Sequence, residues 1–211
     1  MRKNYVSVLA GFMCFFVCSF VIADTGSGSF DEKLREGIRL HDAARVDPAN
    51  IEKGKAILES IQKESSVAMA YYGSIITLEA GQYAKNKNGI QALILLKKGT
   101  ELIDTAVAST PALPELRFLR MENSYEVSIG SPVNRFKIMK TDIDWLEVRM
   151  KGYEPPLQGT IELYKGLYLV KSRKLEEGLS AFDACIAISP GSPEAIEAKK
   201  QIDRYAESTN P

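Results

Sequence analysis

The 211-residue chain has one histidine, three cysteines and no excess of either charge, and each shortage excludes a class of protein. A lone histidine lacks the companions that a metal site or an acid–base site needs, and no zinc-like Cys/His spacing is present. Lys+Arg and Asp+Glu both number 27, which argues against a dedicated nucleic-acid binder. Glycine-rich phosphate loops and calcium-loop patterns are also missing. We therefore expect no metal, no cofactor and no nucleic-acid partner.

The N-terminus carries the strongest local signal. A short cationic stretch, MRKN, is followed by YVSVLAGFMCFFVCSFVIA without a charge, and Val21 and Ala23 suit the small-residue positions of a signal peptidase site. We interpret residues 1–23 as a signal peptide, so that the remainder is exported to the periplasm or secreted. The alternative is an uncleaved membrane anchor formed by residues 5–23, whose length approaches that of a membrane span. We expect membrane contact only through this segment, if at all.

Cleavage after Ala23 changes the cysteine count. Cys14 and Cys18 leave with the signal peptide, and Cys185 remains alone. One cysteine cannot form an intramolecular disulfide, so the exported part has to be stable through packing.

The rest of the chain predicts helices and no strand. Apolar residues recur at three- and four-residue steps, and Gly, Ser and Pro punctuate them, as in GSP at 130–132. We count nine helices, which makes the fold all-α. The expected organisation is a flexible leader over 24–30, one helical domain over 31–207 and a frayed tail over 208–211.

The segment IELYKGLYLVKSRKLEEGLSAFDACIAISPGSPEA resembles a tetratricopeptide repeat (TPR). The small, aromatic and proline positions that carry the resemblance are Gly166, Gly178, Phe182, Cys185 and Pro190. The resemblance is clearest over residues 159–195. It implies small residues where paired helices approach closely, and an aromatic side chain, Phe182, that fills the space between them. The implied fold is a short right-handed solenoid of helical hairpins, in which prolines set the angle between repeats.

A weaker match covers residues 67–114. Gly73 corresponds to Gly166, and the second helix of this match contains Gly99, Ile103, Ala106 and Pro111. About 14 extra residues separate its two halves, which lengthens either the loop or the helices. Residues 31–65 and 115–150 pair as hairpins without good motif matches.

His41 beside Asp42 is the one pairing that suggests acid–base chemistry. Adjacent residues on a helix point about 100° apart, so we expect the two side chains not to face each other. His41 is then a surface or helix-end residue, because an acid–base site needs converging partners. Cys185 has no base near it in sequence and is expected to pack rather than react. The chain is therefore not expected to be an enzyme.

In TPR proteins the first helices of the repeats line a concave surface that binds extended peptides or helices. The resemblance places seven residues toward that surface: Leu163, Leu167, Val170 and Lys171 in the last repeat, and Ala70, Ser74 and Thr77 in the middle one. Trp145 lies off the apolar stripe of its helix and is added as a contact candidate. The Lys, Asn and Arg residues with which this family recognises a peptide carboxylate are mostly absent. The competing interpretation is that the chain's own helices cover the surface.

These features predict an exported, non-enzymatic adaptor that scaffolds protein–protein contacts in the cell envelope. The alternative is a periplasmic accessory protein whose helical groove binds a small apolar ligand, linked to a transporter by analogy of fold and location. An open, polar-rimmed groove favours the adaptor, and a closed apolar pocket favours the ligand-binding protein.

Overall fold

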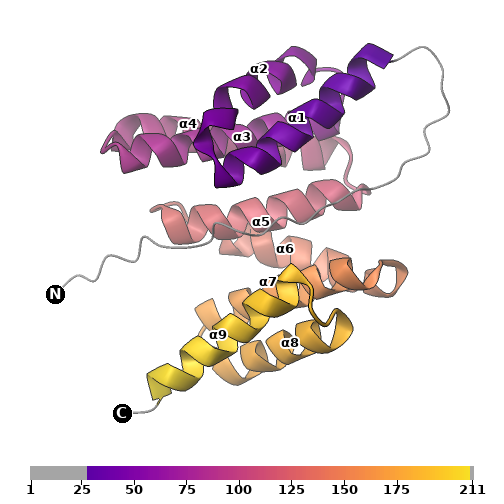
Figure 1. The fold of residues 1–211 in the computed structure, drawn as a ribbon, viewed down its shortest axis with the longest axis vertical. Helices are drawn as coiled ribbons and strands as arrows, with labels where there is room; N and C mark the ends of the chain where they lie inside the picture. Colours follow the sequence, from indigo (N-terminus) through magenta and orange to yellow (C-terminus); the bar gives the residue numbers. More distant parts are fainter. Residues whose placement is uncertain (1–27, 210–211) are drawn as a thin grey trace. The chain divides into compact units, whose positions relative to one another are not determined.

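A computed structural model describes residues 28–209, with their side chains over 30–207. Within this range the chain forms nine α-helices, two short 3-10 helices and no strand, which confirms the expected all-α fold and helix number (Figure 1). The elements are α1 (Gly28–Val46), η1 (Pro48–Asn50), α2 (Ile51–Ile61), α3 (Ser66–Lys85), α4 (Gly89–Ser109), α5 (Pro114–Gly130), α6 (Phe136–Glu147), η2 (Met150–Gly152), α7 (Pro155–Lys171), α8 (Leu175–Ile188) and α9 (Pro193–Thr209).

The ends of the described range differ slightly from the expectation. Residues 28–30 of the expected leader belong to α1, and residues 208–209 of the expected tail belong to α9. The proposed signal peptide over 1–23 lies outside the described residues. Among the helices that are described, none combines the length and the apolarity needed to cross a bilayer.

Short polar side chains and prolines set the helix starts. Ser65 Oγ accepts from the Val67 N–H at 3.1 Å at the start of α3, and Ser192 Oγ accepts from the Ala195 N–H at 3.1 Å at the start of α9. Asp47 Oδ1 accepts from the Ala49 N–H at 3.0 Å and caps η1. Prolines occupy the first helical position of α5, α7 and α9, where the missing N–H costs nothing. Ser, Asp and Pro residues at the helix starts therefore define most of the turns.

The described residues separate into two compact units, divided between Gly99 and Thr100. The boundary falls within α4, whose first half belongs to the first unit and whose second half belongs to the second. Its first half packs closely on α3 at Gly99, whereas Asp104 in its second half is ion-paired with Arg120 of α5.

In the first unit, α1 packs on α2, and both pack on α3. Buried apolar side chains from these three helices form its core: Leu40, Ile51, Leu58, Ile61, Ile75 and Ile76. A Cβ atom on Gly37 would lie 2.6 Å from Cδ2 of Leu58, so α1 and α2 approach closely at this glycine.

In the second unit, α5 pairs with α6, α7 pairs with α8, and α9 packs on both α7 and α8 (Figure 1). α7 also contacts α5 and α6, so each hairpin packs against the next. The largest enclosed side chains come from all four paired helices: Leu116, Met121, Met139, Leu146, Ile161, Leu163 and Phe182. The expected pairing of residues 115–150 as a hairpin is confirmed.

The extra residues of the middle repeat lengthen both helices rather than the loop. α3 continues for 12 residues after Gly73, against 5 for α7 after Gly166. α4 begins 10 residues before Gly99, against 3 for α8 before Gly178. Between its glycine and the turn, each helix of the α3–α4 hairpin thus extends seven residues further, about two helical turns. The turn between α3 and α4 is tight, with Lys87 at φ 61°.

Candidate functional site

The first cluster of buried polar groups joins α1 to α3 through His41, which is only 1% exposed. Its Nδ1 lies 2.9 Å from Oδ1 of Asp42, and its Nε2 lies 2.8 Å from Oγ of Ser74. Because a carboxylate only accepts, we assign the ring proton to Nδ1, which donates to Asp42, and the Ser74 hydroxyl donates to Nε2. The ring also meets Tyr71 edge-on, with centroids 5.1 Å apart.

This geometry corrects the expectations for His41, which is buried and hydrogen-bonded to its neighbour. Nδ1 is the ring nitrogen nearer the backbone, so the short side chain of Asp42 reaches it although the two residues diverge along α1. Nε2 extends from α1 to α3. The position of His41, three residues after Ile38 and seven after Leu34 on the apolar stripe, was the signal for its burial.

The order Ser74–His41–Asp42 matches the hydrogen-bond order of an acyl-transfer triad. A nucleophile also needs access to substrate and donors for the developing oxyanion. Ser74 is 3% exposed and lies in the middle of α3, where the backbone N–H groups are bonded within the helix. The arrangement therefore satisfies both nitrogens of an enclosed imidazole and stabilises the contact between α1 and α3.

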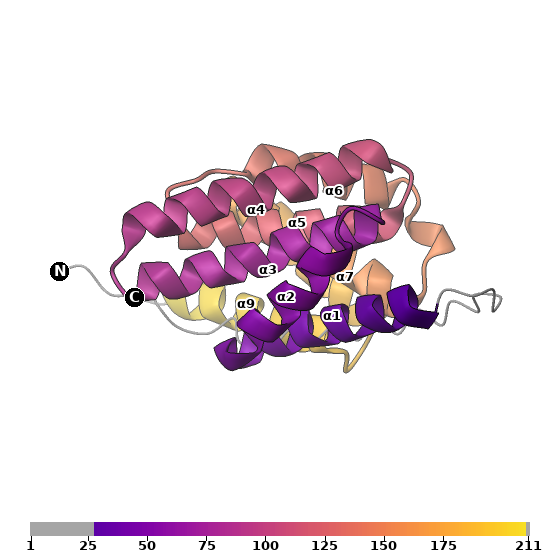
Figure 2. The same ribbon diagram turned by 90° about the horizontal axis from the view of Figure 1, so that it is seen from above.

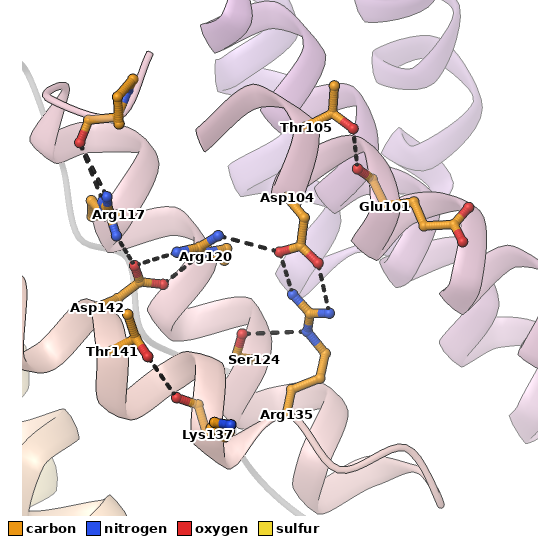
Figure 3. A network of polar contacts seen from close by, with 11 residues as sticks. Glu101, Asp104, Thr105, Arg117, Arg120, Ser124, Arg135, Lys137, Thr141 and Asp142 are labelled. Atoms are coloured by element: carbon orange, nitrogen blue, oxygen red, sulfur yellow. Dashed lines mark hydrogen bonds and ion pairs between the residues drawn. The ribbon is translucent and has the colours of Figure 1, made fainter. Parts of the chain in front are cut away.

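The second cluster lies in the other unit and consists of arginines and aspartates from α4, α5, α6 and the loop before α6 (Figure 3). Asp142 is fully buried and accepts from Arg117 Nη1 at 3.0 Å. Arg120 donates to both oxygens of the same carboxylate at 2.7 Å. This bidentate pair joins α5 to α6.

Asp104 of α4 is the second acidic centre of the network. Arg135 donates to its two oxygens at 2.8 and 3.1 Å, and Arg120 Nη1 lies 3.5 Å from Oδ1 (Figure 3). Arg120 thus bridges Asp142 and Asp104. Burial alone would lower the pKa of Arg120, but its bonds to the two carboxylates raise it.

Arginines also surround Trp145. The guanidinium carbons of Arg117 and Arg149 lie 5.0 and 3.8 Å from the ring centroid, at cation–π distance. Arg149 also donates to the Trp145 carbonyl at 2.9 Å. The ring is therefore held by the protein's own cations.

The network links helices rather than presenting open charges. Asp142 and Asp104 already occupy the donor pairs that a bidentate anion would need from Arg120 and Arg135. Its function is to hold the second half of α4 against α5 and α6. The sequence signal that was missed is Asp142 itself, an acidic residue on the buried stripe of Met139, Ile143 and Leu146.

The expected groove contacts lie mostly inside the protein. Leu163 and Leu167 are 2% and 6% exposed. Ser74 bonds His41, and the Thr77 hydroxyl donates to the Ser74 carbonyl at 2.7 Å. Val170 and Trp145 are half-buried, and only Lys171 is exposed.

The described residues contain no group of three or more His, Cys, Asp and Glu side chains that could hold a metal ion. Comparison of the chain with protein-family models, curated proteins and solved structures finds no match.

Proposed function

We propose that this chain is an exported, non-enzymatic adaptor of the TPR type, which holds protein partners together in the cell envelope. The observation that carries the proposal is a close approach of paired helices at a glycine, which recurs in three hairpins. Repeated hairpins of this kind stack into extended binding surfaces.

The arrangement is clearest in the α7–α8 hairpin. A Cβ atom on Gly166 would lie 2.4 Å from Cε1 of Phe182, and one on Gly178 would lie 3.1 Å from the Gly166 carbonyl oxygen. The two helices therefore meet at their backbones, with the Phe182 ring beside the contact. This is where the TPR resemblance places its small and aromatic residues.

Each of the other two hairpins shares one of these contacts. A Cβ atom on Gly99 of α4 would lie 2.5 Å from the Gly73 carbonyl oxygen of α3. In the α1–α2 hairpin, Gly37 faces Leu58, which follows Gly54 by four residues as Phe182 follows Gly178. The first hairpin had no recognisable motif in the sequence, so its packing adds support that the sequence lacked.

The choice between adaptor and ligand-binding protein rests on which side chains remain available. A groove for an apolar molecule needs open apolar walls, but Leu163 and Leu167 are enclosed by the protein. On the same helix Lys171 is exposed. Next to Tyr125 of α5 lie charged groups of α5 and α9, among them Glu126 and Arg204. Enclosed apolar residues and an exposed charged residue on α7 support a protein partner over an apolar ligand.

Site-specific photo-crosslinking in the living cell tests this proposal. The full chain carries a photoreactive amino acid in place of Lys171, at the exposed end of α7. The matched control carries it in place of Asp183, an exposed residue of α8. Both substitutions are at the surface and leave the cores of the hairpins unchanged.

The adaptor proposal predicts a crosslinked band of defined mass from position 171 and a much weaker one from position 183. Equal, diffuse labelling at both positions contradicts it. So does a crosslink only to a small molecule, which supports the ligand-binding alternative.

A further inference from the structure

The lengthened end of the α3–α4 hairpin exposes apolar side chains and lysines that do not contribute to the core of the hairpin. We call residues 80–98 the tip; they comprise the end of α3, the turn and the first ten residues of α4. The ends of α3 and α4 joined by this turn extend beyond the α1–α2 turn (Figures 1 and 2). A Cβ atom at Gly81 or Gly89 would meet nothing within 4 Å, so this end of the hairpin is not closely covered.

Large apolar side chains are exposed on the tip. Ile90, Leu93 and Ile94 are 79%, 44% and 56% exposed. Their spacing of three and four residues places them on one face of α4. The other strongly exposed apolar residues of the described chain are scattered singly over four other places: Val46, Ile129, Val148 and Ile196. A single exposed residue needs no explanation, but three on two turns of one helix do.

The charge of the tip is equally one-sided. It contains four lysines and no acidic residue, although the whole chain is balanced at 27 and 27. All four lysines are exposed: Lys85, Lys87, Lys97 and Lys98. Lys85 and Lys87 lie on the turn side of the apolar face, and Lys97 and Lys98 follow it along α4.

We propose that the tip docks on an anionic lipid surface, with Ile90, Leu93 and Ile94 entering the interface and Lys85 and Lys87 contacting lipid headgroups. Lys98 instead contacts Tyr72 of α3, with its Nζ 3.5 Å from the hydroxyl oxygen and 5.5 Å from the ring centroid. Apolar side chains flanked by lysines on a helix are the features that bind such surfaces. The four positive charges disfavour a symmetric contact with the tip of a second copy. The lipid contact is separate from the N-terminal segment.

Vesicle binding by the full chain tests the proposal, with phosphatidylcholine vesicles that contain or lack phosphatidylglycerol. One variant combines Lys85→Gln with Lys87→Gln, and a second combines Ile90→Gln with Ile94→Gln. The matched controls on α9 are Lys199→Gln with Lys200→Gln, and Ile196→Gln, all at exposed positions. Because every variant keeps residues 1–23, any binding through that segment is common to all and cancels.

The proposal predicts about fivefold weaker binding to anionic vesicles for each lysine removed, and about tenfold or more for the isoleucine pair. The α9 controls should stay within about twofold of wild type, since they lie outside the tip. Anionic vesicles should also slow hydrogen exchange over residues 83–98, and added salt should reverse the lysine contribution.

Equal binding by tip and control variants overturns the proposal. So does exchange protection of the tip by an acidic protein but not by vesicles, which makes the surface a protein-binding one. The adaptor proposal is tested separately at Lys171, so either proposal can fail while the other stands.

Discussion

Replacing Asp142 with asparagine removes the central charge of the Arg–Asp network and keeps the shape of the side chain. The carboxylate is fully buried, and the two guanidiniums that bind it are only 12% and 13% exposed. Asparagine accepts through one oxygen, so Arg117 and Arg120 lose part of their bonding and face an amide nitrogen. The arginines then keep their charges in a poorly solvated place without the carboxylate that compensates them.

Removing one partner of a buried ion pair costs about 3–5 kcal/mol. The lower value applies here, because Arg120 keeps its contact with Asp104 at 3.5 Å and both arginines reach some solvent. We therefore expect a loss of about 3 kcal/mol. For a domain of this size, that lowers the melting temperature by roughly 6–12 °C.

Trp145 provides the assay, because it is the only tryptophan in the chain and lies beside Arg117. Its fluorescence follows unfolding of the unit that contains the network, even if the two units melt separately. The matched control is Asp144→Asn on the same helix. Asp144 is exposed and pairs with Lys140 four residues earlier, so its loss should cost about 0.5 kcal/mol or less.

The reasoning is refuted if the two variants melt within the error of each other. That outcome would mean that the enclosed carboxylate contributes no more than a surface ion pair. Asp142→Leu combined with Arg117→Met and Arg120→Met gives a second check, because replacing all three buried charges by apolar side chains should recover much of the stability.

Four further outcomes follow from the packing. Phe182→Ala should destabilise the second unit by about 3–5 kcal/mol, because the ring is fully buried against Gly166; an unchanged melting curve would contradict the repeat alignment. Burial raises the pKa of Cys185 to about 12, so iodoacetamide at mildly alkaline pH should modify it in urea but not in the native protein; rapid native labelling would show an open site. Burial raises the pKa of Glu162 above its usual 4.5, so its ionisation opposes folding as pH rises through that raised value; Glu162→Gln should melt above wild type at neutral pH, and the gap should close in acid. A fluorophosphonate probe should not label the chain, because Ser74 is enclosed; labelling that disappears in Ser74→Ala would give the His41 cluster a catalytic role.

The helices were predictable because their signals are local. Ser-Pro and Gly-Ser-Pro stretches mark the turns, and the three- and four-residue apolar steps mark the buried faces. The end of α3 was less predictable: apolar periodicity stops near Ala80, yet the helix continues to Lys85. A hairpin partner of equal length, α4, accompanies this extension, and local periodicity does not reveal such a partner.

The polar clusters were not predictable, because each depends on contacts between distant residues. His41 bonds Ser74 across 33 residues, and Asp142 bonds Arg117 and Arg120 across 25 and 22. The position of a polar residue on an apolar stripe predicts that the residue is buried, as both His41 and Asp142 show. It does not identify the partner that makes burial tolerable.

The proposed adaptor function requires that this chain bind another protein. Native mass spectrometry on the tagged full-length protein, purified gently from the cells that make it, tests that claim most directly. The account predicts a second polypeptide bound at defined stoichiometry, and Lys171→Glu should weaken that complex more than Asp183→Lys does. A small added mass that leaves on denaturation, with no second polypeptide, would contradict the adaptor and identify a ligand instead.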